Sequence, residues 1–126
     1  MTIPNKVKKI AIKEAMKSQH RFKLGAVIYK KGNILNSGFN HANKTHPKSN
    51  VPFRTIHAEL SSCLGLTRMQ LKDASIYVHR VRRDGKVGLA KPCRYCQALL
   101  DEVGITDINY SSYSDNVLTQ PLQTKH

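Results

Sequence analysis

Two short motifs limit the folds open to this chain, because their side chains act together only if the fold brings them to one point. They are His57-x-Glu59 and Pro92-Cys93-x-x-Cys96, with 36 residues from the histidine to the first cysteine. One histidine and two cysteines supply three ligands for a tetrahedral Zn²⁺, one fewer than a closed structural site takes. Cys93 and Cys96 share one side of a first helical turn, whereas His57 and Glu59 converge only at a helix amino end. The motifs therefore predict two helix amino ends that meet at one zinc site.

The cysteine pair has other interpretations. A Cys-x-x-Cys pair is also typical of redox sites and of half a zinc ribbon. A ribbon needs a second pair, and the chain has only one further cysteine, Cys63. On the expected helix Cys63 lies about 240° round the axis from His57, at roughly 100° per residue, so it faces away from the site. We therefore expect Cys63 to be a small buried side chain and not a ligand.

Together and in this order, the motifs resemble the signature of the cytidine deaminase-like superfamily, which includes cytidine, deoxycytidylate and tRNA adenosine deaminases. The resemblance implies an α/β domain with three α-β-α layers and a mixed, mostly five-stranded central sheet. It implies that His57, Cys93 and Cys96 hold Zn²⁺ as the cofactor and that Glu59 is the catalytic proton carrier. The alternative for Glu59 is a carboxylate that only complements a helix amino end. The expected reaction is hydrolytic deamination of cytosine in a free nucleoside or nucleotide, of the cytidine or deoxycytidylate type, to the uracil counterpart and ammonia.

The resemblance also places four residues in the substrate pocket. Asn40 corresponds to an asparagine that binds the sugar, although asparagine is common in turns as well. The backbone of Ala58 corresponds to the position that contacts the base, and Ala26 and Pro92 are expected in the same pocket. Lys91 departs from the family, which often carries serine there in cytosine enzymes or glutamate in tRNA adenosine enzymes. That position therefore does not distinguish cytosine from adenine.

Composition indicates one compact domain over residues 1–126, with 40% hydrophobic residues and no apolar run long enough for a membrane span or signal peptide. Two cysteines needed as thiolates favour a reducing, cytoplasmic location. The formal charge is +13, and residues 1–50 hold eleven Lys or Arg against Glu14 alone. Such an excess indicates an anionic partner, either a nucleotide or a polynucleotide, unless the basic surface is merely solvated.

The amino-terminal third of the chain changes from helical to strand periodicity. Residues 4–18 predict an amphipathic helix with apolar residues at helical spacing. Its basic stripe consists of Lys6, Lys9, Lys13 and Lys17. Residues 24–29 and 34–39 flank Lys31-Gly32-Asn33 and predict a β-hairpin.

The segment around the first motif is expected to be a loop followed by a helix. Residues 41–54 contain two prolines and predict an irregular loop. The helix is expected over residues 56–64, with Thr55 as its N-cap and Gly65 at its end.

The second motif lies between two predicted strands. A strand is expected over residues 75–79, followed by a turn at 83–86 and a loop to residue 91. Pro92 suits a helix start, and the helix body, 96–103, ends at Gly104. Residues 108–110 predict a strand, and residues 117–119 are expected to pair back as the last one.

The last predicted strands and the net charge bear on the class of substrate. A short antiparallel ending resembles enzymes of free nucleosides and nucleotides, whereas nucleic-acid editors usually add a helix and a parallel strand. The net charge favours the alternative, a deaminase of cytosine or adenine in single-stranded DNA or tRNA. A non-catalytic zinc protein is a third interpretation.

Apolar residues on more than one side of the motif helices predict a homo-oligomer. They are Leu60, Cys63, Leu64, Ala98, Leu99, Leu100 and Val103.

Overall fold

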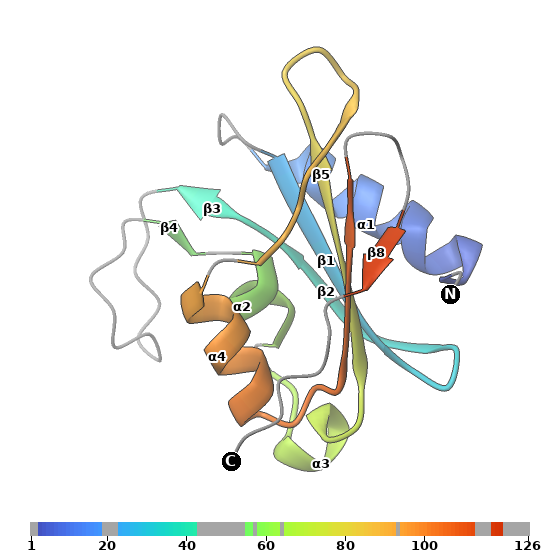
Figure 1. Ribbon diagram of the computed structural model, residues 1–126, viewed down its shortest axis with the longest axis vertical. Coiled ribbons are helices and arrows are strands. Elements are labelled where there is room, and N and C mark those ends of the chain that lie inside the picture. Colours follow the sequence, from blue (N-terminus) through green and yellow to red (C-terminus); the bar gives the residue numbers. More distant parts are fainter. Residues whose placement is uncertain are drawn as a thin grey trace.

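The computed structural model describes residues 3–18, 23–42, 55–56, 58–63, 65–92, 94–112 and 117–119, which form a central mixed sheet with helices on both faces (Figure 1). The sheet has six strands in the order β2-β1-β5-β7-β8, and β6 pairs with β5 beyond the end of β7. β5 and β7 run parallel, and the other described pairs of this sheet are antiparallel. The strands are β1 (Lys23–Lys30), β2 (Asn33–Phe39), β5 (Ser75–Val81), β6 (Val87–Gly88), β7 (Asp107–Ser111) and β8 (Val117–Thr119).

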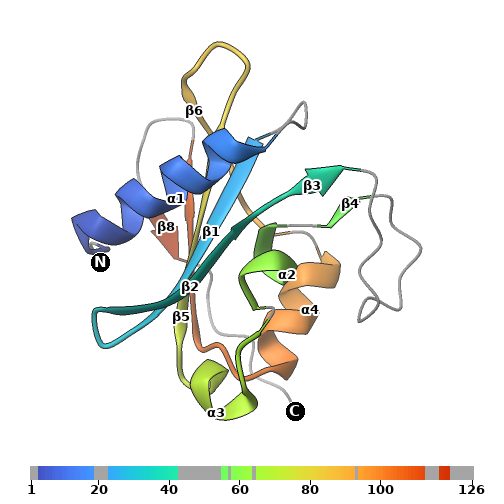
Figure 2. The same cartoon turned by 180° about the vertical axis from the view of Figure 1, so that it is seen from behind.

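Helices cover the two faces of this sheet unequally (Figure 1 and Figure 2). One long helix, α1 (Asn5–Lys17), packs across β1, β2 and β5. On the opposite face lie α2 (Ala58–Cys63) and α4 (Arg94–Glu102), while the short α3 (Arg68–Leu71) precedes β5. The predicted three-layer α-β-α architecture is confirmed.

Side chains of the central strands alternate between two apolar cores, as the pleat of a strand requires. Ala26 and Ile28 on β1 belong to the core under α2 and α4. Val27 and Tyr29, their neighbours along the strand, belong to the core under α1. β1 is therefore buried on both faces, which explains its continuous apolar run.

Two glycines allow the helices to approach the sheet closely, one on each face. A Cβ atom built on Gly25 of β1 would overlap the carbonyl oxygen of Ala11 and the backbone nitrogen of Ala15, both on α1. A Cβ atom on Gly38 of β2 would lie 2.7 Å from the backbone of both Ser61 and Ser62 on α2. Because these obstacles are backbone atoms, neither helix can keep its position if the glycine beneath it gains a side chain.

The first hairpin turns in two residues rather than the three that were predicted. Lys31 and Gly32 both have positive φ angles, 51° and 80°, which is the requirement of a type I′ turn. Asn33 already belongs to β2, where it pairs with Lys30. The register shifts between Ile28 and Tyr29, so β2 carries one extra residue, a β-bulge.

The prediction around the first motif was wrong at two points. Thr55 is not a helix N-cap but lies in β4 (Thr55–Ile56), which pairs with β3 (His41–Ala42). The expected loop 41–54 therefore begins as a strand, while residues 43–54 lie outside the described residues. α2 starts only at Ala58 and is shorter than predicted, although Gly65 follows it with a φ angle of +87° as expected.

Later in the chain the predicted helix and hairpin are confirmed, but two short elements were missed. α4 ends before Gly104, whose φ angle is +94°, and β8 pairs antiparallel with β7. β6 occupies part of the predicted loop before Lys91. α3 is held by a capping box in which Thr67 and Gln70 exchange side-chain and backbone hydrogen bonds of 3.2 and 2.8 Å. In the part of the chain that the structure describes, no helix is long and apolar enough to cross a membrane.

Candidate active site

The starts of α2 and α4 lie on one face of the sheet, at the end where β3 and β4 are found (Figure 1 and Figure 2). The two helices contact each other. Ala58, the first residue of α2, is fully buried, and Cys96, in the first turn of α4, is 1% exposed. Two helix amino ends thus adjoin one buried region, which is the arrangement that the motif spacing predicts.

Not every residue of the motifs can be placed. His57 and Cys93 lie outside the described residues. Glu59 is the second residue of α2, where only its backbone belongs to the described part of the chain. The structure therefore places Cys96, Ala58 and the backbone of Glu59 in the first turns of two helices that contact each other, and the complete ligand set stays a prediction.

The described residues fit a zinc site. Cys96 is a buried thiol in the amino-terminal turn of a helix, where the partial positive charge of the peptide groups stabilises a thiolate. Neither Cys96 nor Cys63 forms a disulfide. Cys63 is partly buried against the apolar core, less than predicted, and its exclusion from the ligand set stays a prediction. Within the described residues no three potential ligands cluster, since two of the three expected ones lie outside them.

Asn40 directly follows β2 and is 3% exposed. Its side-chain Oδ1 accepts a hydrogen bond of 3.0 Å from the backbone N–H of Leu24, and its own N–H donates to the Leu24 carbonyl at 3.2 Å. The hydroxyl of Ser18, just beyond α1, donates to the Asn40 carbonyl at 2.9 Å. The orientation of the Asn40 amide is therefore set by β1, and its role in sugar binding stays a prediction.

Ala26 and Ala58 are both fully buried and belong to the same core, on the face of the sheet that carries α2 and α4. Pro92 is buried too, and the side-chain amide of Gln97 donates a hydrogen bond of 3.2 Å to its carbonyl. Gln97 thereby ties Pro92, the first residue of the second motif, to the first turn of α4. Sequence reasoning did not single out Gln97, because a glutamine within a helix gives no local signal of this role.

A hollow of about 590 Å³ opens beside the start of α4. The described residues that line it are Lys91, Pro92, Arg94, Gln97 and Ala98. Lys91 and Arg94 are exposed and give it a basic rim. The hollow lies on the outer side of α4, since Cys96 and Leu100 of the same helix face inward and are buried.

Ser111, the last residue of β7, fixes the path of the chain toward the second motif. Its hydroxyl donates a hydrogen bond of 2.7 Å to the Gly88 carbonyl and accepts one of 3.1 Å from the Arg80 N–H. Its carbonyl accepts from the Ala90 N–H at 2.9 Å. Because Ser111 is almost fully buried, these bonds hold residues 88–90 against the sheet just before Pro92.

Residues 1–112 match the family described as the cytidine and deoxycytidylate deaminase zinc-binding region. Among sequences of curated proteins, none matches this chain.

The fold is similar to solved structures of deaminases. Cytidine deaminase from Burkholderia pseudomallei is similar with a TM-score of 0.67 and 17% identity, covering 94% of this chain and 92% of that one. Cytidine deaminase from Mycobacterium leprae gives 0.60 and 21%, covering 91% of each chain. The dCMP deaminase of cyanophage S-TIM5 gives 0.54 and 18%, covering 90% and 88%. At these identities the similarity shows the fold alone.

Proposed function

The chain belongs to the cytidine and deoxycytidylate deaminase family, and we propose that it hydrolyses the exocyclic amino group of cytosine in a free nucleoside or nucleotide in a zinc-dependent reaction. The products are the uracil counterpart and ammonia. The observation that carries this proposal is the buried Cys96 in the first turn of α4, next to the buried start of α2. The two motifs of the sequence begin these two helices.

His57, Cys93 and Cys96 are the residues that would hold the metal. When bound, Zn²⁺ supplies a Lewis acid that makes water acidic enough to give hydroxide near neutral pH. Glu59 accepts one proton of the attacking water and passes it to the ring nitrogen beside the carbon under attack. It then takes the second proton from the hydroxyl added to that carbon and delivers it to the amino nitrogen, so that ammonia leaves and the carbonyl forms. Asn40 orients the sugar, while Ala26, Ala58 and Pro92 line the space for the base.

The ending of the chain supports a free nucleoside or nucleotide as substrate. β8 runs antiparallel to β7, with Tyr110 paired to Leu118, and this resembles enzymes of free substrates rather than nucleic-acid editors. A structure of the cyanophage S-TIM5 dCMP deaminase contains dCMP and dUMP, and it is similar with a TM-score of 0.53 and 17% identity over 88% of this chain. A nucleotide is therefore included in the substrate class.

The test is product formation by the purified, zinc-loaded protein. Cytidine, deoxycytidine and their monophosphates are incubated separately, and ammonia and the uracil product are measured by mass spectrometry. We expect turnover of at least one of the four and its loss on Cys96→Ser, which also lowers the zinc content. Absence of product from all four substrates would refute the proposal.

The alternative is a deaminase of cytosine or adenine in single-stranded DNA or tRNA, and the formal charge of +13 favours it. The same mass spectrometry on a cytosine-containing oligonucleotide and on tRNA separates the two. Conversion within the polynucleotide, with none of the free nucleotides, would establish the alternative.

We also propose that the protein is cytoplasmic, since thiolate ligands need a reducing compartment. We further propose that it forms a homo-oligomer. Leu100 is buried within the single chain, while Leu99 and Val103 stay partly exposed and Ala98 is exposed. The outer side of α4 is thus the surface for a second copy. Light scattering at about 0.15 M salt, where the Debye length is about 8 Å, should give a mass of two or more chains. A single-chain mass at micromolar concentration would refute assembly.

A further inference from the structure

The outward side of α1 carries an unusual concentration of positive charge. Lys6, Lys9, Lys13 and Lys17, the basic stripe, are all exposed. The one acidic residue of this helix, Glu14, is buried, and its carboxylate bonds Lys17 at 3.0 Å and Ser37 at 2.9 Å. The three lysines nearer the amino end of α1 therefore face solvent with no acidic side chain of α1 beside them.

Helix stability does not explain this pattern. Lysines three or four positions apart on a helix surface repel one another, and the stripe contains three such pairs. The first turn of α1 has no acidic residue, although the helix dipole favours negative charge there, and Lys6 and Lys8 occupy it instead. Apart from Lys17, which suits the last turn and pairs with Glu14, the arrangement opposes both local preferences, which indicates that the charges serve something outside the chain.

The stripe lies on the other side of the molecule from the candidate active site. α1 packs on one face of the sheet, and α2 and α4 pack on the opposite face (Figure 1 and Figure 2). A ligand bound along α1 is thus separated from Cys96 by the helix and the sheet. The stripe is a surface of its own and does not belong to the substrate pocket.

We propose that the outward side of α1 binds the sugar-phosphate backbone of a nucleic-acid strand without presenting it to the active site. With a rise of about 1.5 Å per residue, the four lysines span roughly 16 Å of helix. A nucleic-acid strand carries one phosphate per about 3.4 Å of duplex axis, so a strand along α1 offers a phosphate to each lysine. This binding is independent of base identity and of deamination.

An anionic membrane is the competing partner for a basic helix, and the burial of α1 opposes it. Val7, Ala11 and Ala15 are fully buried against the sheet, so the apolar side of α1 cannot enter a bilayer. Only Ile12 and Met16, 37% and 55% exposed, remain on the outward side. Interfacial helices need a much larger exposed apolar face.

The experiment measures binding of a fluorescent 20-nucleotide oligothymidylate to the full-length protein as salt is varied. This strand contains no cytosine, so it tests the α1 surface separately from the proposed reaction, and binding would stand even if deamination were refuted. The test variant is K6Q/K9Q/K13Q. The matched control, R68Q/K72Q/R83Q, removes three exposed positive charges from α3, its C-cap and the β5–β6 turn.

We expect the triple α1 variant to bind at least about tenfold more weakly at 0.1 M salt and to lower the slope of log affinity against log salt by about 2. The control variant should bind like the native protein. Far-ultraviolet circular dichroism and the melting temperature check that α1 remains folded, and the single substitution Lys13→Glu serves if the triple variant is unstable.

Three outcomes would overturn the proposal. One is equal weakening by both triple variants, which would indicate overall charge rather than the stripe. Another is binding to vesicles of phosphatidylserine but not to the oligonucleotide. The third is absence of salt-dependent binding by the native chain.

Discussion

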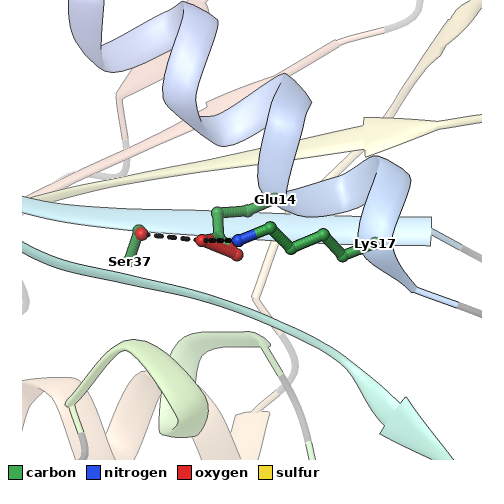
Figure 3. Close-up of polar contacts among 3 residues, drawn as sticks. All are labelled: Glu14, Lys17 and Ser37. Carbon is green, nitrogen blue, oxygen red and sulfur yellow. Dashed lines mark hydrogen bonds and ion pairs between the residues drawn. The ribbon is translucent and has the colours of Figure 1, made fainter.

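Buried polar side chains gather on the α1 side of the sheet, whereas the side under α2 and α4 is lined mainly by small and apolar ones. Glu14 bridges Ser37 and Lys17 on the α1 side (Figure 3). The opposite core contains four alanines together with Ile76, Val78 and Leu100. Hydrogen bonds between fixed partners define a single arrangement of a layer, and apolar contacts tolerate small shifts. The comparison indicates that the α1 side fixes the arrangement of the layers. The side under α2 and α4, which carries the candidate active site, tolerates the small shifts that a reaction requires.

The polar network continues along the α1 side of the sheet beyond α1. The hydroxyl of Tyr77 and Nδ1 of His79 lie 2.8 Å apart. The side-chain amide of Asn109 donates to the Tyr29 hydroxyl at 3.3 Å, and the Thr119 hydroxyl donates to the side-chain Oδ1 of Asn109 at 2.7 Å. The bonds of Asn109 join β8 to β1 across β7 and β5.

The largest expected effect is on chemistry alone. Glu59→Gln should lower the turnover number about 10²–10⁴-fold, because the proton carrier is lost. Zinc content and melting temperature should stay within error of the native protein. Ammonia release, metal analysis and calorimetry measure these three quantities, and a turnover within tenfold of native would contradict the role of Glu59.

The same substitution on the two faces should separate stability from activity. Gly25→Ala pushes α1 away from β1 and should lower the free energy of unfolding by about 1–3 kcal/mol, with the turnover number per folded molecule retained. Gly38→Ala collides with the backbone of α2 and should cost similar stability, and it should also reduce turnover because α2 carries Glu59. Urea unfolding and steady-state kinetics on both variants test this. Equal activity in the two variants would show that the faces do not differ in this way.

The hydrogen bonds of Glu14 with Ser37 and Lys17 should contribute to stability and not to turnover. Glu14→Ala removes the acceptor of two hydrogen bonds and should cost about 1–3 kcal/mol of unfolding free energy. Lys17→Ala is the control, since its side chain is 50% exposed and such an ion pair contributes at most about 1 kcal/mol. A larger loss for Lys17→Ala than for Glu14→Ala in urea unfolding would be the contrary result.

The smallest effect concerns alkaline pH. Burial, with the charge of Asp107 in addition, raises the pKa of Tyr29 from 10.0 to about 12. The unfolded chain releases this proton first, so stability is full below pH 10 and falls as pH rises from 10 toward about 12. Tyr29→Phe should cost about 1 kcal/mol near neutral pH and show a weaker loss of stability over the alkaline range. An unchanged pH dependence in thermal unfolding would exclude Tyr29 as its source.

Local patterns in the sequence predicted the elements whose residues carry their own signal. The lysine and apolar periodicities defined α1, and Lys31-Gly32 placed the hairpin. The spacing within the two motifs predicted that two helix starts adjoin, and the starts of α2 and α4, with the buried Ala58 and Cys96, lie on one face of the sheet (Figure 1). The order of the three layers followed from the resemblance rather than from any single residue.

Long-range pairing was not predictable in the same way. Thr55 suits an N-cap and a strand equally well, and only its pairing with Ala42 decides for the strand. The four residues of α3 are too few to show a period, although Thr67 and Gln70 carry a capping signal that could have found it. The contacts of Ser111 depend on the register of β7 in the sheet. A slip by one residue would turn its side chain to the opposite face.

Ser111 has a consequence for the order of events during protein synthesis. Residues 88–90, which lead into the second motif, take their hydrogen bonds from a residue that follows the whole of α4. A nascent chain that has emerged only to residue 106 contains both motifs but lacks these bonds. α1, β1 and β2, in contrast, pair with neighbours close in sequence and can assemble early. The segment that leads into the second motif therefore reaches its final path only after β7 has left the ribosome, which makes the proposed site one of the last parts of the domain to mature.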